Sequence, residues 1–273
     1  MNSSNCELCA FENPKVSATA IIIKNNAVLL LKRNEEPFKG MWDFPGGYAN
    51  KGETSAYAIQ REIQEELGVI PWHIRYITTF TGTGFYRETA IPINNFFYLV
   101  DIAGYDIKLN EENSEFVWMP IKDLDPKDIA FDSNSRFSLY LKQNFYYDLD
   151  KVRDLIFQLD TTARFDEQKL YIASLEGYVS KQWIDDKLIG MGWIFPRQTM
   201  LRKQAVVEDM IVDKEYRGFG YGKHLLDDLV KWAAKEGVEM IELTSNPARI
   251  AANELYKKYG FKLHSTNHYL YKI

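Results

Sequence analysis

The chain has 273 residues, of which 46% are apolar and 26% charged, and its formal net charge is −5. Its length favours two domains, its composition is typical of a soluble globular protein, and its acidity argues against nucleic-acid partners. No run of about 18 apolar residues and no basic, apolar leader occurs, so we expect neither a membrane partner nor a signal peptide. With two cysteines, a disulfide scaffold is excluded and a reducing, cytoplasmic compartment is expected.

The two cysteines, Cys6 and Cys9, form a single C-x-x-C pair near the start of the chain. A structural zinc site needs four ligands, and no second pair follows. One interpretation is half of a zinc ribbon, completed by the second subunit of a homodimer. The other is a short tail, residues 1–14, without a metal.

The first domain is expected to span residues 1–147. Its predicted strands are 17–23, 27–32, 74–80, 95–100 and 115–119, and its predicted helices are 55–67 and 133–142. In the first helix, Ala56, Ile59, Ile63 and Leu67 fall on one face, and Gly68 is expected to end it.

The second domain is expected to span residues 148–273. Strands are predicted at 178–184, 187–194, 205–212 and 239–243, helices at 152–159 and 222–236, and a closing hairpin at 261–264 and 269–272. A further helix is predicted between Asn246, a good N-cap followed by Pro247, and Gly260, a good residue to end it. Both domains therefore mix helices with strands, which indicates an α/β (α+β) fold class.

Three carboxylates gather on the helix that follows the Gly46-Gly47 pair. Glu62, Glu65 and Glu66 are spaced i, i+3 and i+4, so they share one stripe, where like charges repel. A divalent cation would relieve this repulsion, and hard oxygen ligands suit Mg²⁺ or Mn²⁺. Arg61 precedes Glu65 by four residues and can orient it. The alternative is a solvated helix face that happens to be rich in glutamate.

This stretch resembles the Nudix box, G-x5-E-x7-R-E-U-x-E-E-x-G-U, where U is aliphatic. The matching residues are Gly47, Glu53, Arg61, Glu62, Ile63, Glu65, Glu66, Gly68 and Val69. The resemblance covers roughly residues 15–145 and implies an α/β/α sandwich. It also implies that Glu62, Glu65, Glu66 and the Gly47 carbonyl hold the metal, and that Glu53 braces the loop or reaches the metal through water.

The same resemblance implies Mg²⁺-dependent hydrolysis of a nucleoside diphosphate linked to another moiety. Glu115 or Glu112 would act as the catalytic base, although Glu115 could equally be structural. The first candidate substrate is ADP-ribose or a related dinucleotide. Four aromatic side chains could stack on its base or could simply fill the core: Phe38, Trp42, Phe85 and Tyr86.

A glycine-rich turn lies between a strand and a helix of the second domain. Amide groups at a helix N-terminus favour anions, so the turn at residues 217–222 could hold a pyrophosphate. Taken alone, it could be only a tight turn. With its context it resembles motif A of the GNAT N-acetyltransferases, and Ala252 to Phe261 resembles motif B.

The GNAT resemblance covers about residues 148–273 and implies acetyl-CoA as the cofactor and a small-molecule or peptide amine as the acceptor. It assigns cofactor binding to Met210, Ile211, Val212, Arg217, Gly218, Phe219, Gly220, Tyr221, Gly222 and Asn253. Tyr256 would protonate the leaving thiolate, and Glu208 or Asp209 would deprotonate the amine. The region before Lys187, which builds the acceptor pocket in this family, is short.

Three interpretations of the whole chain remain. The first is a bifunctional enzyme that combines a Nudix hydrolase with an acetyltransferase. The second keeps the hydrolase and makes the GNAT half a non-catalytic domain that binds coenzyme A. The third is a non-catalytic nucleotide-binding regulator, and the intact box argues against it.

Overall fold

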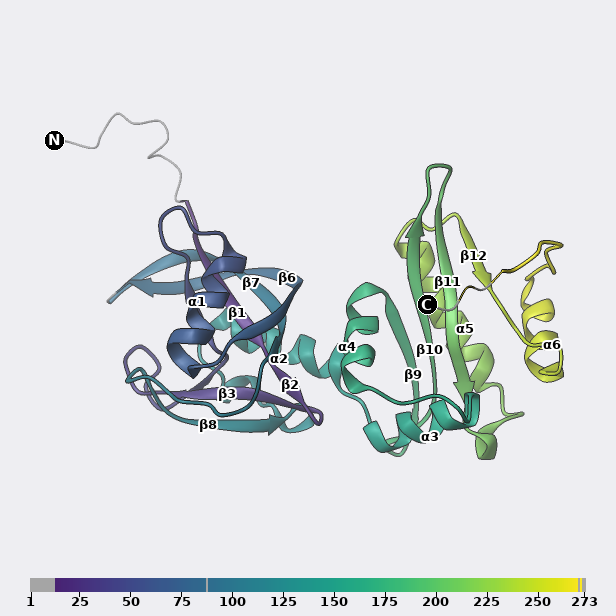
Figure 1. The fold of residues 1–273 in the computed structure, drawn as a ribbon, viewed down its shortest axis with the longest axis horizontal. Coiled ribbons are helices and arrows are strands. Elements are labelled where there is room, and N and C mark those ends of the chain that lie inside the picture. The colour runs from purple at the N-terminus through teal and green to yellow at the C-terminus, as the bar shows by residue number, and fades with distance from the viewer. Residues whose placement is uncertain (1–12, 87, 270, 272–273) are drawn as a thin grey trace. The chain divides into compact units, whose positions relative to one another are not determined.

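The computed structural model describes residues 13–86, 88–269 and 271. The chain divides into two compact units, residues 1–146 and 147–273 (Figure 1). Cys6 and Cys9 lie outside the described residues. In the part of the chain that is described, no helix is long and apolar enough to cross a membrane.

Among its described residues, the first unit contains one mixed sheet, one antiparallel sheet and two α-helices. One sheet has the order β5-β1-β7-β6, and in the other β3 pairs with β2, β4 and β8. The strands are β1 Lys15–Ile21, β2 Ile23–Lys24, β3 Ala27–Arg33, β4 Trp42–Asp43, β5 Gly46–Tyr48, β6 Pro71–Tyr86, β7 Thr89–Ile102 and β8 Asn113–Pro120. The helices are α1 Ser55–Leu67 and α2 Asp132–Phe145, with short 3-10 turns at Ile121–Asp123 and Pro126–Asp128.

The alternation of side chains along β7 explains the layers of this unit. Tyr98 and Val100 belong to the apolar cluster that contains α1, whereas Phe97 stacks on Phe137 of α2 with ring centroids 4.0 Å apart. Because successive side chains of a strand point to opposite faces, α1 and α2 cover opposite faces of this sheet. The expected α/β layering is therefore confirmed.

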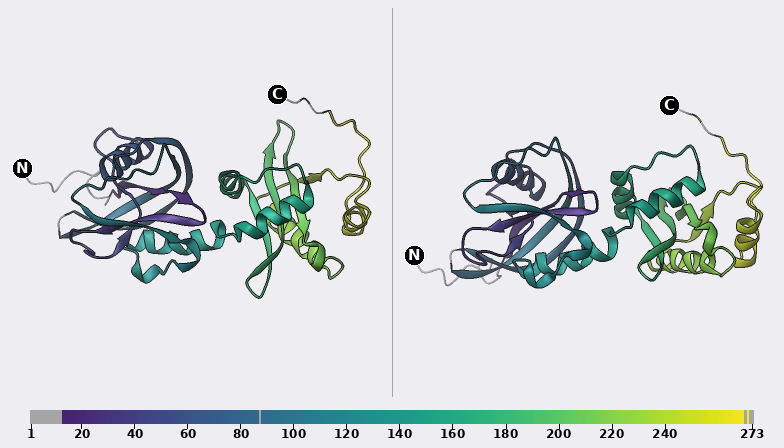
Figure 2. Two further views of the ribbon diagram at one scale, coloured as in Figure 1. Left: turned by 60° about the horizontal axis from the view of Figure 1, so that its bottom comes forward. Right: turned by 90° about the horizontal axis from the view of Figure 1, so that it is seen from below.

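The second unit is one sheet of order β12-β11-β10-β9 with helices packed on it (Figure 2). The strands are β9 Tyr178–Ile184, β10 Lys187–Gln198, β11 Lys203–Val212 and β12 Met240–Leu243. The helices are α3 Leu149–Leu159, α4 Glu167–Glu176, α5 Tyr221–Lys235 and α6 Ile250–Tyr259, with a 3-10 turn at Lys214–Tyr216. Ile194, Ala205 and Val207 pack with Leu229 and Ala233 of α5 in its core.

Two expectations for the second unit differ from the structure. The last helix begins at Ile250, because the Asn246 side chain accepts from the amide of Ala248 (2.9 Å) and so caps a turn before the helix. Residues 261–269 form no strand, and Leu263 and Tyr269 are exposed, so the predicted closing hairpin is absent from the described residues. A segment forms a β-strand only where the edge of a neighbouring strand offers backbone hydrogen bonds.

Candidate functional site

Helix α1 places the box glutamates beside the first apolar core. Thr54 caps its N-terminus by accepting from the amide of Tyr57 (3.2 Å), and Gly68 ends it with a φ of 64°. Ile59 and Ile63 are fully buried on the core side. The glutamate stripe therefore borders the apolar face, as the helical period predicts.

Arg61 organises most of the acidic residues of the box. Its guanidinium donates to Glu53 (3.1 Å), to Glu62 (2.9 Å) and to Glu65 (2.9 Å), and also to the carbonyl of Tyr48 (2.9 Å). Glu53 accepts in addition from the amide of Asn50 (2.8 Å). The loop before α1 is thus tied to the helix through one arginine and one bracing glutamate.

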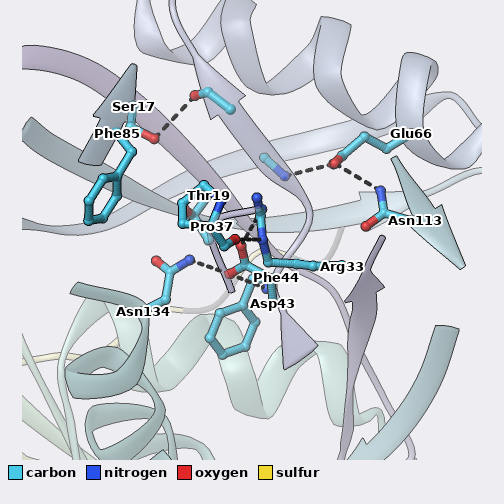
Figure 3. Close-up of polar contacts among 12 residues, drawn as sticks. Ser17, Thr19, Arg33, Pro37, Asp43, Phe44, Glu66, Phe85, Asn113 and Asn134 are labelled. Carbon is cyan, nitrogen blue, oxygen red and sulfur yellow. Dashed lines mark hydrogen bonds and ion pairs between the residues drawn. The ribbon is translucent and has the colours of Figure 1, made fainter. Parts of the chain in front are cut away.

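Glu66 is held differently, because it is buried. Its two carboxylate oxygens accept from the amide of Gly46 (2.8 Å) and from Nδ2 of Asn113 (3.2 Å), as Figure 3 shows. Burial is the main cause that raises the pKa of Glu66 to about 8; the charges of Glu62 and Asp43 act in the same direction, and the hydrogen bonds from Gly46 and Asn113 oppose it. A positive charge brought to this carboxyl would favour its ionised form.

Asn113 is a residue of this site that the sequence analysis missed. It opens β8 at an irregularity in the β3–β8 pairing and also donates to Oδ1 of Asn110 (3.3 Å). An asparagine before a strand is common in turns, so no local signal distinguishes it. Only its position opposite Glu66 reveals the contact.

The two glycines before the helix lie in tightly packed positions. A Cβ on Gly47 would lie 2.2 Å from a carboxylate oxygen of Glu62. A Cβ on Gly46 would lie 2.2 Å from the carbonyl oxygen of Ala18, and the φ of Gly46 is 152°. The Gly47 carbonyl accepts from Oγ of Ser17 (3.2 Å). Glycine at position 46 is therefore required by its positive φ and by the close β1 backbone, whereas glycine at position 47 leaves room for the Glu62 carboxylate.

The carboxylates fit a hard divalent cation by their chemistry. Burial raises the pKa of Glu62, Arg61 opposes this, and the charges of Glu65 and Glu112 add to the rise. In their present arrangement, with Glu62 and Glu65 turned to Arg61, no three acidic, histidine or cysteine side chains of the described residues converge as metal ligands. The raised pKa values of Glu62 and Glu66 mean that ionising these carboxyls together is unfavourable, and a bound cation would favour their ionised forms.

The two candidate bases lie in different surroundings. Glu115 forms an ion pair with Lys32 of the neighbouring strand, and its side chain is 53% exposed. Glu112 lies in the loop before β8, and its charge acts on Glu62. Glu112 is thus the candidate whose surroundings connect it to the glutamate stripe.

The aromatic candidates divide into two groups. Phe38 and Phe85 contact each other with ring centroids 5.8 Å apart, and both also contact Phe131. Trp42 lies in β4 under the ammonium group of Lys32, whereas Tyr86 is 65% exposed at the end of β6. Phe131 was not among the sequence candidates.

In the second unit, the glycine-rich turn leads directly into α5. Gly218 and Gly220 have φ values of 87° and 89°, and α5 begins at Tyr221. Arg217 donates from Nε to the carbonyl of Val212 (2.9 Å), which joins the turn to the end of β11. Phe219 is 73% exposed, so the turn is open to a ligand. A Cβ on Gly222 would lie 3.2 Å from Leu255 of α6.

Strand β11 contains a bulge next to the candidate cofactor residues. Glu208 lies opposite Trp193 and Ile211 opposite Met191, so Asp209 and Met210 together lie opposite Gly192. Asp209 has a φ of 50°. Strand β12 pairs with β11 only along Gln204–Val207. Within the described residues, Met210, Ile211 and Val212 are therefore not paired with β12.

The remaining acetyltransferase candidates lie on β11 and α6. Burial raises the pKa of Glu208, as does the charge of Asp209, while that of His268 opposes the rise. Burial also raises the pKa of Tyr256, which keeps its phenol protonated. Asn253 donates to the carbonyls of Asn246 and Arg249 (both 3.0 Å), so its amide is engaged in the turn before α6.

Comparison with known proteins gives a separate match for each unit. The family model described as the NUDIX domain matches residues 14–140, and that of the acetyltransferase (GNAT) family matches residues 139–261. An ADP-ribose pyrophosphatase of Methanocaldococcus jannaschii is 32% identical over 130 residues, 48% of this chain and 75% of that protein.

Two further proteins are similar to the first unit. The nucleoside triphosphatase NudI of Escherichia coli O81 is 33% identical over 134 residues, 45% of this chain and 92% of that protein. A solved MutT NUDIX hydrolase from Burkholderia pseudomallei is 26% identical with a TM-score of 0.41, covering 47% of this chain and 98% of that one.

Proposed function

Since this chain belongs to the Nudix family and also carries a GNAT acetyltransferase domain, we propose that it is a bifunctional enzyme with two separate active sites. Its first domain hydrolyses a nucleoside diphosphate linked to another moiety. Its second domain transfers an acetyl group from acetyl-CoA to an amine.

The observation that carries the hydrolase proposal is the position of Glu66. This carboxyl is 7% exposed, accepts from Gly46 and Asn113, and lies beside Glu62 on the same helix face. Burying an acidic group beside another acidic group costs stability unless a cation compensates. We propose that Glu62, Glu65, Glu66 and the Gly47 carbonyl hold Mg²⁺ or Mn²⁺ there.

The reaction is the addition of one water molecule across a P–O–P bond, which yields two phosphate monoesters. The bound metal would neutralise the diphosphate and lower the pKa of the attacking water. The hydrogen bonds of Arg61 with Glu53 and with the carbonyl of Tyr48 hold the loop before α1 against the helix. Between the two candidate bases, we favour Glu112 over Glu115, because Glu115 is occupied by Lys32.

The first substrate candidate is ADP-ribose. It is supported by the similarity to an ADP-ribose pyrophosphatase over most of the length of that protein. Nucleoside triphosphates are the second candidate, because a similar protein is a nucleoside triphosphatase. Both classes carry a nucleoside attached to a chain of phosphates.

For the second domain, we propose that acetyl-CoA binds along the free edge of β11 and at the turn before α5. Met210, Ile211 and Val212 offer backbone groups without a β12 partner, and amides at the start of α5 suit a pyrophosphate. Glu208 would accept the proton of the attacking amine, and Tyr256 would return a proton to the thiolate. The acceptor is a small molecule or a peptide with an amino group.

The hydrolase is tested with Glu66→Gln. We expect this variant to lose Mg²⁺-dependent hydrolysis of ADP-ribose by at least about a hundredfold, because it removes a charged oxygen ligand. Phosphate ester products are measured, with circular dichroism to confirm folding. Glu111→Gln, an exposed change in the loop of Glu112, serves as the control. Full activity of Glu66→Gln would contradict the proposal.

A further inference from the structure

An open surface pocket of about 400 Å³, called the cavity below, lies between the loop after β3 and the tip of the β6–β7 hairpin. Glu36, Pro37, Phe85 and Glu88 line it. Its volume falls within the roughly 300–1,000 Å³ of ligand pockets in proteins. None of the four residues belongs to the box, so the cavity is a second feature of the first domain.

The Phe85 ring in the wall of the cavity belongs to an aromatic cluster, and two other members of this cluster, Phe38 and Phe131, have an uncommon backbone conformation. Phe38 lies between Phe85 and Phe131, with ring centroids 5.8 Å and 5.0 Å away. Phe38 and Phe131 have φ values of 67° and 58°. Bulky residues rarely adopt positive φ, so the surrounding contacts fix both rings in place.

Hydrogen bonds join this wall to the residues around the box. The hydroxyl of Tyr48 accepts from the amide of Phe85 (2.9 Å), and the Arg33 guanidinium lies 4.9 Å from the Phe131 ring. Arg33 also donates to the Pro37 carbonyl (2.9 Å) and pairs with Asp43 (3.4 Å). In Figure 3, Arg33, Pro37 and Asp43 are connected in this way. The cavity is therefore attached to the segments that carry the glutamates.

The chemistry of the lining restricts the ligand. A phenyl ring offers a stacking surface for a nucleobase. The carboxyl groups of Glu36 and Glu88 at the cavity offer oxygen atoms that accept hydrogen bonds. An exocyclic amino group, which donates hydrogen bonds, suits these acceptors. Adenine, guanine and cytosine carry such a group, and uracil, thymine and hypoxanthine do not.

We propose that this cavity binds the nucleobase of the hydrolase substrate and selects bases with an exocyclic amino group, through Glu36 and Glu88 around the Phe85 ring. The inference rests on the hydrolase function proposed above for the role of its ligand. It names the substrate class as amino-bearing nucleotides, which includes ADP-ribose. Uridine diphosphate sugars fall outside this class.

The test compares two ligands that differ at one position of the base. Adenosine and inosine monophosphate differ by an amino group against a carbonyl, and calorimetry measures their dissociation constants with the full chain. We expect the adenosine compound to bind at least about tenfold more tightly, as for a lost base-edge contact. In Glu36→Gln and Glu88→Gln the ratio of the two dissociation constants, inosine over adenosine monophosphate, should fall. The glutamine amide can also donate a hydrogen bond to the carbonyl of the inosine base. Glu35→Gln, an exposed neighbour outside the cavity lining, should keep the wild-type ratio.

Hydrolysis of ADP-ribose and of inosine diphosphate ribose is measured in parallel. Equal affinity for the two monophosphates, or a ratio unchanged in both glutamine variants, would overturn the proposed selectivity. A clear preference in binding without hydrolysis of either dinucleotide would support the cavity and count against the hydrolase. Hydrolysis that is lost in Glu66→Gln but indifferent to the base would support the hydrolase and count against the cavity.

Discussion

At the scale of single residues, Asp43 is a buried carboxyl group with a raised pKa. It is 8% exposed and accepts from Asn134 (2.6 Å) and from the amide of Phe44 (2.9 Å), while Arg33 pairs with its other oxygen. Burial raises the pKa of Asp43 to about 6, and these partners only partly oppose the rise. The folded protein therefore binds this proton more tightly than the unfolded chain does.

This difference predicts how stability depends on pH. The pKa of Asp43 in the unfolded chain is near 4. The contribution of this group to the free energy of unfolding is therefore highest below pH 4 and falls as the pH rises to about 6. Two pKa units correspond to about 3 kcal/mol. Asp43→Asn should remove this component, so the variant should lose less stability than the wild type between pH 4 and 7. Urea unfolding at several pH values measures the difference, and parallel curves would contradict the prediction.

At the scale of elements, one buried ion pair fastens α3 to the end of β11. Lys151 of α3 contacts Asp213, with side-chain exposures of 15% and 2%. Asp213 also caps the following 3-10 turn by accepting from the amide of Glu215 (3.0 Å), and its own amide donates to Ile189 (2.8 Å). The pair thus fixes the segment that leads to the glycine-rich turn.

We predict that Lys151→Met lowers the free energy of unfolding of the second domain by about 3–5 kcal/mol, because it leaves a buried carboxylate unpaired. Adding Asp213→Leu should recover part of the loss. Lys223→Met is the control, since its pair with Asp227 is at the surface and should contribute less than about 1 kcal/mol. Chemical denaturation measures all three, and equal losses for the two lysine variants would disprove the special role of the buried pair.

At the scale of the whole molecule, each domain has its own apolar core and its own candidate site. We therefore predict that acetyl-CoA stabilises the second domain by about 2.7 kcal/mol at one hundred times its dissociation constant. Differential scanning calorimetry should show the transition of that domain move upward. No shift at millimolar acetyl-CoA would count against a working cofactor site.

The two activities should also respond separately to substitution. Glu66→Gln should abolish hydrolysis and leave acetyl transfer intact, and Tyr256→Phe should do the reverse, because the sites lie in different domains. Release of coenzyme A and release of phosphate esters are followed in the same samples. Loss of both activities in either variant would reveal a dependence between the domains that their separate cores do not explain.

Local rules explain which elements were predictable. Helix α1 and its end at Gly68 follow from a 3.6-residue apolar period and a glycine with positive φ, both visible in the sequence. Helix α4 was missed, because it buries two adjacent residues, Leu170 and Tyr171, instead of a regular stripe. The closing hairpin was expected from the sequence, but strand pairing depends on an available strand edge, which a local pattern does not encode.

The sequence by itself determined both families and the identity of the acidic stripe, because helical spacing brings Glu62, Glu65 and Glu66 together wherever the helix forms. Only the tertiary structure decided that Glu66 is the buried one, that Asn113 holds it, and that Glu115 is turned to Lys32. It also assembled the cavity beside Phe85. These contacts join segments far apart in the chain, and their formation depends on how sheets and loops pack, which no local pattern specifies.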